Sequence, residues 1–198
     1  MACQEIAGLP IEAALTLSHK VTLPASKWEV TFRQKGYLYN YLLRWLLERV
    51  TSHCQAQSDG CSLRIVFSRR SGTDYQKMIE YLELMRDGRE VMRATRSINW
   101  SVLNIKDISV ETHDRWAGLQ LADCIVSAFF SAVEPNAYGN YEPAYADLLR
   151  DKLITSKGGA LNTGLTVVPS ISGAALDAKQ KEFFLSFRPR VTWNAKVK

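Results

Sequence analysis

The chain contains no long hydrophobic run. Its longest apolar stretches, YLLRWLLERV and CIVSAFFSAV, are about half of the roughly 18 residues that a helix needs to cross a bilayer. The first residues, MACQEIAGLPIEAAL, have no basic start and contain Glu5 and Glu12, so we expect no signal peptide. Both features predict a protein with no membrane partner.

Cysteine is scarce and unpaired in sequence. The four cysteines, Cys3, Cys54, Cys61 and Cys124, form no CxxC motif, so we expect reduced thiols and a cytoplasmic location. His53 with Cys54 and Cys61 resembles half of a zinc site, but no second pair has the required spacing. Buried cysteines and a surface histidine are the favoured interpretation.

Several familiar catalytic signatures are also missing. The chain has no GxxxxGK[ST] loop, no GxSxG elbow, no HExxH and no GxGxxG after a strand. What it does have is 198 residues, 46% hydrophobic and 23% charged, which is the composition of an ordinary globular domain.

The net charge of +5 comes from the end of the chain. Residues 179–198 contain six Lys and Arg and one Glu, so the remainder is neutral. We therefore predict a domain over residues 1–170 and a basic C-terminal extension over 171–198. A solvated terminus is favoured over a nucleic-acid-binding arm, in which Arg188 and Lys196 would contact phosphates.

The hydrophobic pattern alternates between strand and helix. We expect strands at 12–23, 62–68, 102–112 and 165–169, and helices at 37–57, 73–88, 119–134 and 141–153. This order predicts an α/β domain with parallel pairing. Strands 62–68 and 102–112 should lie side by side, with the helix over 119–133 packed across the sheet.

Asp123 is the first candidate site residue. It is the one charged side chain between Arg115 and Glu134, on an otherwise apolar helix. Such a carboxylate is costly unless it has a cation, a metal or several donors, although a place near the helix N-terminus would also stabilise it. We predict that it points to a polar cavity near Ser68 or Glu111.

The segment VFSRRSGTDY is the second candidate. Ser68, Arg69 and Arg70 follow a predicted strand and precede Gly72, where an α/β sheet often binds an anion. An ordinary strand-to-helix turn is the favoured alternative. The sequence ETHD (111–114) is either a metal-binding cluster or, more simply, a polar loop.

Four segments in this order resemble one family: YLYNYLLRWLLERV, LRIVFSRRSGTDYQKMIEYLELMR, GLQLADCIVSAFFSAVEP with YEPAYADLL, and LNTGLTVVP. The chain is similar over about residues 15–170 to the domain-of-unknown-function 3800 family of bacterial and phage proteins. The resemblance implies an RNase H-like fold, with a mixed central sheet flanked by helices.

The resemblance also implies a metal-dependent nuclease. Asp123 in the QLAD motif would be the catalytic and metal-binding residue, with Mg²⁺ as cofactor. Glu48 or Glu111 would assist, and Arg69 and Arg70 would lie near phosphate. Because Glu48 lies between Leu47 and Arg49, an exposed charge pair on the helix surface is the favoured interpretation of that residue. Asp114 is a further possible partner of Asp123 in this comparison.

One departure from the family is large, because the chain contains no D-E-S-G strand, which usually carries the central metal ligand. We therefore expect a shortened relative, and two hypotheses remain. The first is an RNase H-like nuclease, or its inactive remnant, that acts on or binds nucleic acid. The second is a non-catalytic protein-binding or inhibitory scaffold, whose unpaired sheet edge invites a homo-oligomer or a partner strand.

Overall fold

Two separate pairs of parallel strands form the β-structure. The computed structural model describes residues 2–20, 22, 29–89 and 97–189. Strand β1 (Leu15–Ser18) pairs with β4 (Leu165–Val168), and β2 (Val66–Ser68) pairs with β3 (Ser109–Glu111). The expected α/β class is therefore confirmed, and the expected parallel pairing of 62–68 with 102–112 is confirmed for the short strands β2 and β3. The expected mixed central sheet is not formed by the described residues, whose strands make two separate parallel pairs.

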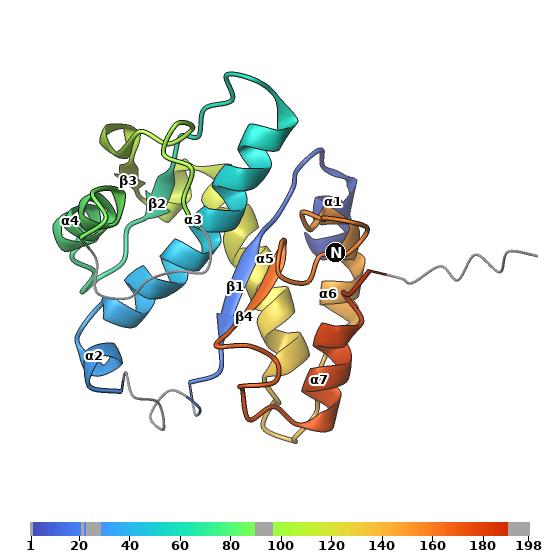
Figure 1. Ribbon diagram of the computed structural model, residues 1–198. Helices are drawn as coiled ribbons and strands as arrows, with labels where there is room; N and C mark the ends of the chain where they lie inside the picture. The colour runs from blue at the N-terminus through green and yellow to red at the C-terminus, as the bar shows by residue number, and fades with distance from the viewer. Residues whose placement is uncertain (1, 21, 23–28, 90–96, 190–198) are drawn as a thin grey trace, which may run out of the picture.

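Helices lie on both sides of the strands. Helix α3 crosses in front of them and α5 crosses behind (Figure 1). The helices are α1 (Ala2–Gly8), α2 (Glu29–Arg33), α3 (Tyr37–Gln57), α4 (Tyr75–Arg86), α5 (Ala117–Val133), α6 (Ala144–Leu148) and α7 (Ala178–Leu185). Short 3-10 turns occur at Ile105–Asp107, His113–Arg115 and Arg150–Lys152.

Helices α3 and α4 follow the sequence pattern closely. Helix α3 occupies the predicted range, beginning after Gly36, whose φ of 84° suits a residue without a side chain. Helix α4 begins at Tyr75, two residues after the start of the predicted range 73–88. Its N-cap is Asp74, whose carboxylate accepts a hydrogen bond from the Lys77 amide.

The predicted strand over 102–112 is largely absent. Only Ser109–Glu111 is a strand, preceded by an isolated bridge from Leu103 to Leu63. Between them Asn104 accepts a hydrogen bond from the Lys106 amide and starts a 3-10 turn. A short polar side chain of this kind offers the backbone an alternative to the ladder.

Two apolar cores lie on different sides of α3. The first surrounds Phe129 of α5 and includes residues of β1, β4, α6 and α7. The second contains Leu43 and Leu47 of α3 together with Phe67 of β2 and Leu82 of α4. Each strand pair therefore belongs to its own core.

Residues after 170 do not form a separate extension in the part that the structure describes. The side chains of Phe184 and Phe187 are buried in the first core, and the Phe187 ring lies 5.9 Å from that of Phe129. A capping box between Asp177 and Gln180 fixes the start of α7. The burial of these apolar side chains attaches the segment to the domain, although its basic composition suggested a solvated extension.

Cys54 and Cys61 are joined by a disulfide, with their Cα atoms 5.9 Å apart. This differs from the expectation that these thiols are reduced. Cys3 and Cys124 are free and partly buried. Among the described helices, none combines the length and the apolarity that a bilayer crossing requires.

Candidate binding site

Asp123 lies where α5 meets the ends of β2 and β3. Its Oδ1 atom is 3.6 Å from Arg70 Nη2, and its Oδ2 atom is 3.3 Å from His113 Nδ1. About half of the carboxylate side chain is exposed. The cost of placing this charge on an apolar helix is thus reduced by two basic neighbours and by solvent.

A groove of about 540 Å³ opens beside this cluster. Its wall contains Asp123, His113, Gln120 and Cys124, together with Tyr145 of α6. Asp123 therefore borders a cavity, but the surface of that cavity is mostly apolar and not polar as expected, and the contacts of Asp123 are with Arg70 and His113 in place of the expected Ser68 or Glu111.

The site residues do not fit a magnesium ion. Mg²⁺ needs several oxygen ligands in near-octahedral geometry, and a two-metal nuclease needs carboxylates on both sides of the phosphate. Both oxygens of Asp123 instead face basic nitrogens. Within the described ranges, no three His, Cys, Asp or Glu side chains are grouped to hold a metal.

Glu48 lies in the interior of the protein. Its side chain is 1% exposed, with Oε1 3.2 Å from Arg44 Nε and Oε2 3.1 Å from Arg49 Nη1. Burial raises the pKa of the Glu48 carboxyl above its ordinary value, against the opposing effect of the two arginines. The expected exposed helix pair is therefore wrong, and a carboxylate enclosed in this way does not reach a substrate.

The strand end after β2 is held by local hydrogen bonds. The Arg69 amide donates to the Glu111 carbonyl oxygen, and the Tyr75 hydroxyl donates to the Ser68 carbonyl oxygen. The Arg70 amide in turn donates to the Tyr75 hydroxyl. The side chains of Arg69 and Arg70 remain exposed, so they are accessible to a ligand.

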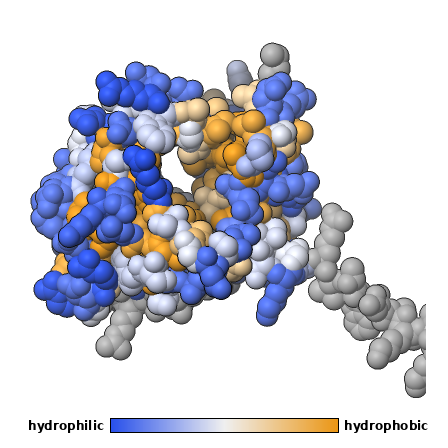
Figure 2. Space-filling model, turned by 90° about the horizontal axis from the view of Figure 1, so that it is seen from above, coloured by the Kyte–Doolittle hydropathy of each residue, from blue (hydrophilic) through white to orange (hydrophobic). Residues whose placement is uncertain are grey.

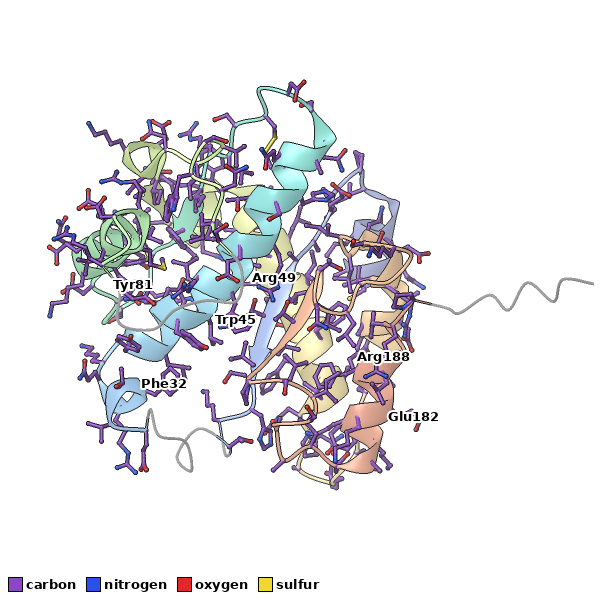
Figure 3. The ribbon with its side chains drawn as sticks, in the orientation of Figure 1. Phe32, Trp45, Arg49, Tyr81, Glu182 and Arg188 are labelled. Carbon is purple, nitrogen blue, oxygen red and sulfur yellow. A yellow bond between two sulfur atoms is a disulfide. The ribbon has the colours of Figure 1, made fainter. Side chains whose placement is uncertain are left out.

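Arg188, one of the two basic residues expected in the tail, is not part of this cluster. Arg188 is exposed just after α7, which lies on the opposite side of the molecule from β2 (Figures 1 and 3). Lys196 lies outside the described residues. The carboxyl of Asp114 has a lowered pKa because the Thr112 side chain donates a hydrogen bond to it, whereas the carboxylate of Asp123 is paired with Arg70 and His113.

A hollow between the two strand pairs was not anticipated from the sequence. Figure 2 shows it in the middle of the molecule, with hydrophobic surface along its wall. On α5, Ile125 and Phe129 face the first core and Asp123 faces Arg70. The surface between these two directions carries Val126 and Phe130, which are 51% and 53% exposed.

Helix α3 presents a matching surface. Tyr39 lies near Arg70, whose charge lowers the Tyr39 pKa while burial raises it more strongly. Leu46 and Val50 follow Tyr39 on the same helix face and are only partly buried. On another face of α3, Arg49 lies over the Trp45 ring and points toward the β1–β4 pair (Figure 3).

One signal in the sequence could have revealed this surface. Helix α5 is apolar around almost its whole circumference, and a helix of that kind requires cover on more than one face. Helical spacing alone places Val126 and Phe129 on one apolar stripe of the helix. In the structure the buried face of α5 contains Ile125 and Phe129, whereas Val126 and Phe130 lie on the neighbouring face and are exposed.

Comparison of the chain with family models, with curated protein sequences and with solved structures finds no match to any of them.

Proposed function

We propose that this protein is a non-catalytic binding protein whose ligand is another polypeptide. The observation that carries the proposal is the exposed pair Val126 and Phe130 on α5, between the face toward the first core and the face toward Arg70. Neighbouring large apolar side chains that remain exposed are typical of protein interaction sites. Two observations argue against metal-dependent hydrolysis. Both carboxylate oxygens of Asp123 face basic nitrogens, and the described residues contain no group of three His, Cys, Asp or Glu side chains that could hold a metal ion.

Peptide selection tests the proposal. A library of displayed random peptides of about nine residues, long enough for a typical strand, is selected on the purified full chain. We expect enriched peptides that bind the wild type and lose at least about tenfold in affinity on V126K/F130K, because burying a lysine ammonium in an apolar contact is costly. Affinity is measured by fluorescence anisotropy with synthetic copies.

The matched control is Y138K/L148K, which places lysines on an exposed aromatic and an exposed aliphatic side chain that lie neither in the groove beside Asp123 nor on α5. Binding should be unchanged in this control. Failure to enrich any peptide, or equal losses in both double variants, would contradict the proposal. Far-UV circular dichroism checks that both variants fold.

Nucleic acid is the second candidate ligand, and the observation in its favour is the exposed pair Arg69 and Arg70 at the end of β2. This candidate retains the proposed relationship to the RNase H-like fold, for which the strand–helix order is the support. Binding to a labelled oligonucleotide that falls steeply with salt, and falls further in R69A/R70A, would favour it.

We expect no Mg²⁺- or Mn²⁺-dependent cleavage of single- or double-stranded oligonucleotides by the full chain. The physical reason is the ligand set, because a single carboxylate between two basic groups cannot hold the paired ions of phosphodiester hydrolysis. D123N should be indistinguishable from the wild type in a gel assay. Cleavage by the wild type that disappears in D123N would restore the nuclease hypothesis.

A further inference from the structure

The hollow is bordered by one unpaired strand edge on each side. Residues 65, 67 and 69 direct their main-chain groups to β3, as the bonds from Ser109 to Ile65 and from Arg69 to Glu111 show. The N–H and C=O groups of Val66, and the N–H of Ser68, therefore point away from β3. No hydrogen bond to another described segment satisfies the main chain of Val66.

Strand β1 has the same property on the other side. Leu15 and His19 donate to β4 and its preceding loop, so the main-chain groups of Thr16 and Ser18 point to the opposite edge. Figure 1 places β2–β3 and β1–β4 on either side of the crossing of α3 and α5. The two open edges therefore face the region between the pairs.

Helix α3 supplies an apolar surface in front of this region, and α5 supplies one behind it (Figure 1). Val126 and Phe130 lie on the side of α5 between its core face and the Arg70 contact. Leu46 and Val50 continue the α3 face that begins at Tyr39, also beside Arg70. A parallel strand buried between two helix layers is apolar on both of its sides, and these surfaces suit such a strand.

The chemistry of this surround selects an extended polypeptide. Unpaired main-chain donors and acceptors among apolar side chains are costly, and the main chain of a strand satisfies an edge by a regular ladder. A second folded copy is not suited to supply it through its described strands, because helices flank those strands and would have to enter the region with them. A separate extended segment can enter between the helix layers.

We propose that an extended, β-branched-rich segment of another protein inserts between β2 and β1 and joins the two strand pairs into one sheet. The inserted segment bonds to Val66 and Ser68 on one side and to Thr16 and Ser18 on the other. This inference rests on the proposed function and specifies its binding mode.

Amide hydrogen exchange tests the binding mode with a peptide enriched in the selection described above. Bound peptide should slow exchange of the Thr16, Ser18, Val66 and Ser68 amides by at least about tenfold, because all four become bonded. The Phe67 amide, already in the β2–β3 ladder, should change much less. Assigned NMR spectra of the full chain give the rates for single residues.

Peptides N-methylated at alternate residues provide the second measurement. Methyl groups that block the main-chain donors toward one edge should weaken binding relative to the unmethylated peptide of the same sequence. Protection on one edge alone, or binding without protection of any of the four amides, would overturn strand insertion while leaving peptide binding intact. Failure to enrich a peptide would overturn both.

Discussion

Replacing Glu48 with alanine is expected to lower the free energy of unfolding by about 3–5 kcal/mol. Glu48 is 1% exposed and lies within 3.2 Å of Arg44 and 3.1 Å of Arg49, both of which are also buried. Removing the carboxylate leaves two buried guanidinium groups without their anion and opens a cavity in the protein. Urea denaturation followed by circular dichroism gives the change.

E48Q is the matched variant, since glutamine keeps the shape and one oxygen acceptor. Its loss should be smaller than that of E48A. Lys152→Ala, which removes a positive charge from the exposed hydrogen bond to the Leu9 carbonyl, should cost little. Equal effects of E48A and K152A would show that the buried ion pairs contribute nothing to stability.

The raised pKa of Glu48 gives this comparison a pH dependence. Because folding disfavours the ionised carboxyl, the folded state binds a proton at a higher pH than the unfolded state. The stability of the wild type relative to E48Q should therefore rise as the pH falls through the folded-state pKa. It should level off below the ordinary value of 4.5. A fall in relative stability over this window would contradict the assigned direction.

Phe184→Ala is expected to cost about 3–5 kcal/mol, the usual loss for a phenylalanine in a core. The Phe184 side chain is 1% exposed and packs against Phe183, whose ring contacts Phe129 and Phe187. Such a loss would mean that residues after 170 belong to the folding unit. Thermal and urea unfolding of the full chain measure it.

Leu185→Ala is the control on the same helix. Leu185 is 37% exposed, so its truncation should cost much less than that of Phe184. If F184A were as mild as L185A, the C-terminal segment would be an appendage, as its basic composition first indicated.

The local features of this fold could be predicted from the sequence. Helix α3 was predicted over its exact range, because its apolar residues repeat at helical spacing without an internal Gly or Pro. The parallel pairing of β2 and β3 followed from the alternation of strands and helices. In each case the signal lies within a short stretch of chain.

The candidate site was predicted only in part. Asp123 could be singled out from the sequence, because a charge on an apolar helix is visible there. Its partners Arg70 and His113 come from other segments, 53 and 10 positions away, and no local pattern pairs them. The same limit explains why Glu48 was expected at the surface.

Tertiary structure alone decided which apolar surfaces are covered. The sequence determined that α5 is apolar on nearly every side, but Phe129 became core and Phe130 stayed exposed because of where α7 and β4 pack. The hollow likewise depends on the placement of two strand pairs that are far apart in the chain. Hydrophobic burial is non-directional and scales with contact area. The residue types therefore specify which surfaces tend to be covered, and the tertiary packing specifies which elements cover them.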